Sequence, residues 1–70
     1  MNKEQVFSLL KDSILIVKNR EKELKINKNL QQAFLRQNEL IKSGMETLSK
    51  EDKELLEKEY SKWYQEVFLK

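Results

Sequence analysis

The sequence predicts an all-α protein: a small antiparallel bundle of three helices in a single domain that spans residues 1–70. Three observations lead to this prediction. The chain contains no proline and one glycine, so little in it interrupts a helix. Leu, Lys, Glu and Gln, which favour helices, are abundant. Apolar residues also recur at helical spacing in three separate segments, which places helices at residues 3–26, 29–43 and 50–69.

The first helix is expected over residues 3–26. Its apolar residues fall within an arc of roughly 100° when they are projected at helical spacing, which is typical of a helix with one buried face. Asn2 is a suitable N-cap, because its side chain can accept a hydrogen bond from the first turn. The apolar residues of this helix are Val6, Phe7, Leu10, Ile14, Val17 and Leu24.

The second helix is expected over residues 29–43. If it continued the first helix, its apolar face would lie roughly 170° away from the first one. The chain therefore either turns back near residues 25–29 or forms one long helix, giving a helical hairpin as the alternative fold. Asn27 and Asn29 favour the turn, since Asn is a good N-cap, and Gln32 follows Asn29 at the spacing of a capping box. The apolar residues here are Ile26, Leu30, Ala33, Phe34, Leu40 and Ile41.

The third helix is expected over residues 50–69. Gly44 is predicted to end the preceding helix, because glycine readily adopts the left-handed conformation found at helix ends. Ser49 is the predicted N-cap of the third helix, and the acidic Glu51 and Asp52 favour its first turn. The predicted core takes residues from all three helices: Val6, Leu10, Ile14, Val17, Leu30, Phe34, Ile41, Leu56, Tyr60, Trp63 and Val67.

The composition argues against an enzyme. Without His or Cys, the chain cannot build a disulfide framework, a cysteine or histidine metal site, a thiol nucleophile or an imidazole base. A single glycine cannot form a glycine-rich phosphate loop. Glu51, Asp52 and Glu54 occupy one helical turn and point in different directions, so they do not make a paired acid and base or a cation cage. We therefore expect no catalytic residues, no metal and no cofactor.

Ile14, Leu15, Ile16 and Val17 are four consecutive apolar residues. On a helix they point in all directions, so one buried face cannot cover them all. Either this helix is the middle one and is contacted on two sides, or one side is covered by a second copy or another protein, since a 70-residue chain without disulfides gains most from association. In the second case Leu15 and Ile16 are the predicted partner-binding residues.

Aromatic residues are concentrated in the third predicted helix. Tyr60, Trp63, Tyr64 and Phe68 all lie within nine consecutive positions. Tyr60 and Trp63 lie on the predicted buried face and are expected in the core. Tyr64 and Phe68 are predicted to bind a partner, because aromatic residues are enriched at the centres of protein interfaces.

The charges allow an alternative function. The chain has a net charge of +2, and residues 18–28 carry a local positive excess that could contact the phosphates of a nucleic acid. Glu21 and Glu23 interrupt this stretch, and the helix after the turn at residues 43–49 is acidic, which argues against a DNA-reading helix. The basic residues are Lys18, Arg20, Lys22, Lys25 and Lys28.

The sequence thus predicts a small, non-catalytic regulatory or adaptor protein that acts by helix-mediated contact with a protein partner or with itself, including as a homodimer. A nucleic-acid-binding module is the alternative. Polar residues interrupt the apolar segment at residues 6–17, so neither a signal peptide nor a transmembrane segment is expected, and a cytoplasmic location is the default.

Overall fold

The computed structural model describes residues 1–69, so the last residue of the predicted 1–70 domain lies outside the described part. Four helices account for nearly all of it: α1 (Lys3–Asn19), α2 (Glu21–Ile26), α3 (Lys28–Thr47) and α4 (Lys50–Phe68). No strand occurs in residues 1–69, and the all-α prediction is confirmed.

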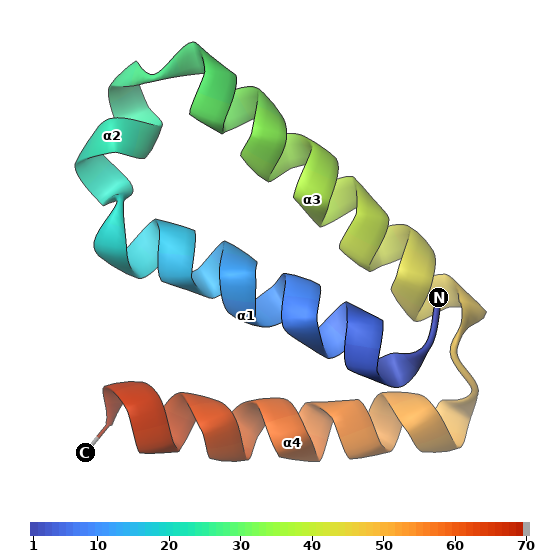
Figure 1. Cartoon of the computed structure of the whole chain (residues 1–70). Helices are drawn as coiled ribbons and strands as arrows, with labels where there is room; N and C mark the ends of the chain where they lie inside the picture. Colours follow the sequence, from blue (N-terminus) through green and yellow to red (C-terminus); the bar gives the residue numbers. More distant parts are fainter. Residues whose placement is uncertain (70) are drawn as a thin grey trace.

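The three long helices lie side by side, with α1 between α3 and α4 (Figure 1). The helices α1 and α4 run in the same direction, α3 runs in the opposite direction, and the short α2 joins α1 to α3 (Figure 1). α3 and α4 pack on different flanks of α1 and barely contact each other.

The molecule is thin. Its extents are 38 × 31 × 12 Å. In a closed three-helix bundle each long helix packs against both others, whereas here α3 and α4 barely contact each other. The long helices therefore form a single open layer, and the closed three-helix bundle expected from the sequence is not confirmed.

Side-chain caps fix the starts of the long helices. Asn2 Oδ1 accepts a hydrogen bond from the Gln5 backbone N–H at 2.9 Å, and the Gln5 side chain accepts one from the Asn2 backbone N–H at 2.9 Å, which completes a capping box. Ser49 Oγ accepts from the Asp52 N–H at 3.1 Å at the start of α4. Both predicted caps are confirmed.

The first helix is shorter than predicted, because the chain breaks at Arg20. Arg20 has φ −127° and ψ 30°, which separates α1 from α2. Its guanidinium donates to both carboxylate oxygens of Glu23 at 2.8 and 2.7 Å, which ties the residue at the break to the first turn of α2. The predicted turn at residues 25–29 is present, but its cap is Asn27, whose Oδ1 accepts from the Leu30 N–H at 3.1 Å; Asn29 lies inside α3.

The second predicted helix is longer than expected, because Gly44 does not end it. α3 continues through Gly44 to Thr47, and no residue of the described chain has a positive φ. A Cβ on Gly44 would lie 2.8 Å from Val6 Cγ2 and 2.7 Å from Met1 Sδ. This glycine therefore permits the close approach of α1 to α3, and the sequence-based interpretation of it as a helix end was wrong.

The buried core is small. Val6, Leu48 and Leu56 form its centre, with partly buried hydrophobic residues around them, and Leu30 is buried where α3 begins. Val17 and Val67, both predicted in the core, are 39% and 49% exposed because no further helix covers them. Leu48 was missed, since it lies in the linker between two predicted helices and belongs to neither apolar face.

Candidate interaction surfaces

Leu15 and Ile16 lie on the flank of α1 that faces α3. They border a shallow groove of about 400 Å³, which we name the α1–α3 groove. Gln37 of α3 spans the contact between the helices, and its Nε2 donates to the Leu9 carbonyl at 3.1 Å. Leu15 and Ile16 are partly buried beside polar neighbours. The residues that line the groove are Asp12, Leu15, Ile16, Asn19, Arg20 and Gln37.

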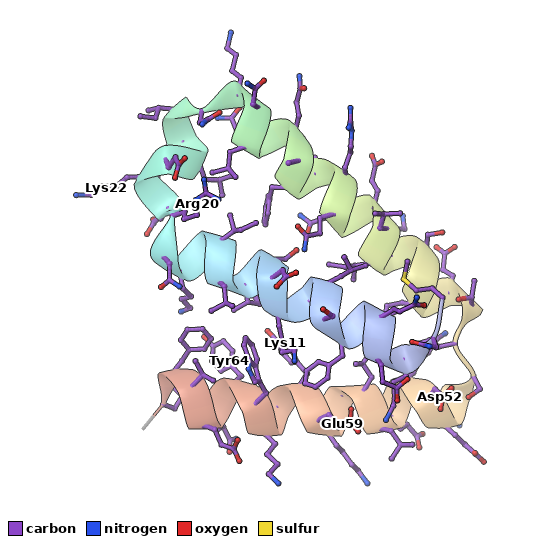
Figure 2. All side chains as sticks on the ribbon, in the orientation of Figure 1. Lys11, Arg20, Lys22, Asp52, Glu59 and Tyr64 are labelled. Carbon is purple, nitrogen blue, oxygen red and sulfur yellow. The ribbon has the colours of Figure 1, made fainter. Side chains whose placement is uncertain are left out.

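Tyr64 and Phe68 lie on α4 and contact the other flank of α1. Tyr64 points from α4 towards α1 (Figure 2). The ring centroids of Tyr64 and Phe68 are 4.9 Å apart, and Lys18 Nζ lies 5.6 Å from each centroid, within cation–π range. Trp63 packs edge-on against Phe68 at 5.6 Å. With Tyr60, 6.1 Å from both Trp63 and Tyr64, these rings form one partly exposed aromatic cluster.

The structure does not bring the four predicted partner-binding residues together. Leu15 and Ile16 border α3, whereas Tyr64 and Phe68 pack on Lys18. The helix turns by about 100° per residue, so Lys18 points away from Ile16 towards a different neighbour. The two pairs therefore belong to two surfaces on different flanks of α1.

A second groove lies between α1 and α4 at the end of α3. It has a volume of about 410 Å³, and we name it the α1–α4 groove. On α4 the spacing of Glu57, Tyr60, Tyr64 and Phe68 places all four on one side of the helix, so the groove is continuous with the aromatic cluster. Its lining residues are Leu10, Met45, Lys53, Leu56, Glu57 and Tyr60.

On α1, Leu10 and Val17 are seven residues apart and face the same way, so Val17 extends the α1–α4 groove along the helix. Leu10, predicted in the core, is partly buried and packs against it, so it forms the floor of the groove together with Met45. Met45 was not considered in the sequence analysis, since it follows the glycine that was expected to end its helix. Val17 was also predicted in the core, but it is 39% exposed because the helices do not close around it.

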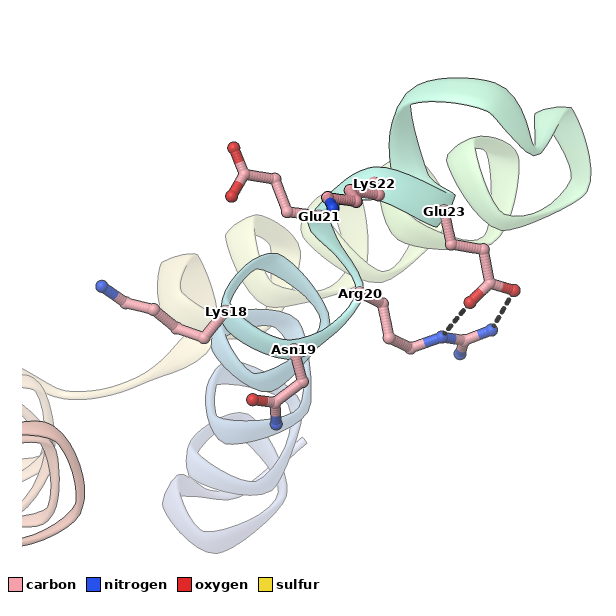
Figure 3. Close-up of a pocket in the computed structure, with 6 residues that line it drawn as sticks. All are labelled: Lys18, Asn19, Arg20, Glu21, Lys22 and Glu23. Carbon is pink, nitrogen blue, oxygen red and sulfur yellow. Dashed lines mark hydrogen bonds and ion pairs between the residues drawn. The ribbon is translucent and has the colours of Figure 1, made fainter.

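The basic stretch at residues 18–28 is partly neutralised within the chain. Arg20 is paired with Glu23 at 2.7 Å (Figure 3), and Lys25 Nζ lies 3.5 Å from Glu21. The hydrogen bond from Arg20 is the main cause of the lowered pKa of Glu23, and the same bond raises the pKa of Arg20.

The remaining basic residues of this stretch do not converge on one site. Lys18 lies over aromatic rings, and it points away from Arg20 in the close-up of the α1–α2 junction (Figure 3). Lys22 and Lys28 make no ion pair within residues 1–69. No contact favours a phosphate site here, and nucleic-acid binding stays a prediction.

Other charged groups are dispersed. In the part of the chain that the structure describes, no three acidic side chains are placed to hold a metal ion. Lys3 Nζ and Glu59 Oε1 are 2.8 Å apart and link α1 to α4, and the hydrogen bond to Glu59 raises the pKa of Lys3. None of the described helices has both the length and the apolar character that crossing a membrane requires.

No family model, curated protein or solved structure matches this chain.

Proposed function

We propose that this chain is a small, non-catalytic regulatory or adaptor protein that acts by docking helical apolar surface onto another protein surface. The observation that carries the proposal is the accessible surface area, 5457 Å². A compact folded monomer of this mass is expected to expose about 4,650 Å². The excess of about 800 Å² equals the area that one partner contributes to an interface of standard size.

The single-layer arrangement accounts for this excess. Each long helix packs against at most two other long helices, so the faces of the layer are open. Few hydrophobic residues in the described chain are buried, whereas eight large ones are exposed. Domains normally bury the apolar faces of their helices against a further layer. The exposed large hydrophobic residues are Met1, Val17, Ile26, Leu35, Leu40, Leu55, Val67 and Leu69.

The aromatic cluster is the part of this surface best suited to recognition. Tyr64 and Phe68 combine large apolar area with partial exposure, and such residues dominate the binding energy of protein interfaces. The absence of His and Cys from the sequence supports a non-catalytic role, because these residues supply most general bases and thiol nucleophiles.

The test compares the wild-type chain, immobilised and exposed to lysate of its native cell, with a Tyr64→Ala/Phe68→Ala variant. We expect the variant to retain about tenfold less of the specifically bound protein, since truncating interface aromatics removes at least 1–2 kcal/mol of binding energy. The melting temperature should fall only slightly, because both side chains are partly exposed in the isolated chain.

Leu35→Ala is the matched control. Leu35 is 60% exposed on α3, which lies on the opposite flank of α1 from the aromatic cluster. Its truncation should change neither binding nor the melting temperature. If Tyr64→Ala/Phe68→Ala lowered stability as strongly as binding, the two rings would be core residues. If wild type retained no protein at all, its own copies included, the proposed function would be wrong.

A further inference from the structure

We propose that the α1–α4 groove docks a second copy of this chain, with the two layers stacked face to face about a two-fold axis. This inference rests on the proposed function, because it names the partner for one of the two surfaces. It commits to self-association through the side of the layer that carries Leu10, Val17 and the aromatic cluster.

The first argument is area. Each copy has a surface of 5457 Å², about 800 Å² more than a compact monomer of its mass. If each copy buries this excess on one face, the two copies bury about 1,600 Å² together, which is the standard size of a stable interface. A second layer would also convert the 12 Å thick molecule into the two-layer architecture that soluble domains normally have.

The second argument is the distribution of apolar residues. Val17 is 39% exposed although the hydrophobic Leu10 and Ile14 precede it on the same side of α1. On α4, Tyr60, Tyr64 and Phe68 continue this surface. The opposite face of α1 carries the polar Ser8, Asp12 and Asn19, and the apolar Leu15 follows the same helical spacing. On α1, the face beside the α1–α4 groove is therefore the more apolar of the two.

The third argument is charge complementarity. At one end of the groove Lys18 lies beside Tyr64 and Phe68, and at the other end Glu57 lies beside Leu10 and Tyr60. Leu10 and Lys18 are eight residues apart on α1, so the two charges are separated by about 12 Å along the layer. A two-fold axis between them places Lys18 of each copy opposite Glu57 of the other.

The wider charge distribution agrees with this arrangement. Lys53 also borders the groove near Glu57, but residues 46–59 as a whole contain six acidic and three basic residues. Residues 18–28 contain five basic and two acidic residues. α1 and α4 run in the same direction, so these two segments lie towards opposite ends of the layer (Figure 1). An antiparallel second copy supplies the complementary charge at both ends.

The test measures molecular mass by light scattering over a wide range of protein concentration. The wild-type chain is expected to form a dimer. Lys18→Glu and Glu57→Lys should each weaken the dimer by about tenfold, since each places like charges opposite one another at two symmetric positions. The Lys18→Glu/Glu57→Lys variant, which exchanges the two charges, should restore dimerisation.

A further variant keeps the test decisive. Val17→Asp places a carboxylate on the apolar face beside the aromatic cluster and should give a monomer, while circular dichroism should still report a helical fold because Val17 is 39% exposed in the isolated chain. Leu40→Asp is its control. Leu40 is 50% exposed and follows Gln37 by three residues, on the side of the α1–α3 groove, so the variant should remain dimeric.

A wild-type monomer at all concentrations would overturn this inference, and capture of a different protein through Tyr64 and Phe68 would then leave the proposed function intact. A dimer that is insensitive to Val17→Asp would also overturn it. Such a dimer would use another face, or would exchange α4 between copies.

Discussion

Gly44 is a residue at which α1 packs closely against α3. It is buried inside α3, and a Cβ at this position would lie 2.8 Å from Val6 Cγ2. Met1 Sδ, the other near atom, is the end of a flexible side chain and can move. Val6 cannot, because it is branched at Cβ and 0% exposed. The position therefore requires glycine for packing and not for its backbone conformation.

Gly44→Ala should consequently destabilise the protein, although alanine favours the helix by about 1 kcal/mol over glycine. Overpacking against Val6 should outweigh that gain and lower the free energy of unfolding by about 1–2 kcal/mol. Val6→Ala alone should lower it by about 2 kcal/mol. Urea unfolding of both variants and of the double variant measures the coupling. The loss in free energy of unfolding should be smaller for the double variant than the sum of the two single losses, because Val6→Ala removes the methyl that clashes with the new Cβ. Losses that simply add would contradict the contact between Gly44 and Val6.

At the scale of elements, helix starts could be predicted from the sequence better than helix ends. Asn2 and Ser49 are followed by residues that complete a local cap, and such caps depend only on neighbours in the chain. The end of α3 depends on a tertiary contact, and the break at Arg20 has no signal in the sequence. Gly44 continues its helix because α1 packs against it, and nothing near Arg20 in the sequence is a helix breaker.

The two asparagines at the α2–α3 junction offer a matched test of this element. Asn27→Ala should lower the free energy of unfolding by about 1 kcal/mol, because it removes the hydrogen bond that Asn27 accepts from the Leu30 N–H at 3.1 Å. Asn29→Ala should raise it by less than about 0.5 kcal/mol, since Asn29 lies within α3 and alanine favours a helix. Thermal unfolding followed by circular dichroism compares the two. If Asn29→Ala were destabilising and Asn27→Ala were not, α3 would begin at Asn29, as the capping-box spacing with Gln32 suggested.

At the scale of the whole molecule, the apolar pattern predicted which helix faces are apolar, but not which helices pack against them. Residues 14–17 lie in the middle helix, between α3 and α4, as the first of the two interpretations of this segment expected. Helical periodicity is a local property of the sequence. The angle between the directions in which α3 and α4 lie, seen along the axis of α1, is set by tertiary packing. The sequence therefore could not predict that α3 and α4 would pack on separate flanks and leave Val17 open.

The central claim is that this open face is covered by a second copy of the chain. The most direct measurement is the melting temperature as a function of protein concentration. If association buries the α1–α4 groove, the melting temperature of the wild-type chain should rise steadily with concentration, because the folded dimer is favoured by mass action. The melting temperature of Val17→Asp should stay constant. A wild-type melting temperature that is the same at every concentration would contradict the claim.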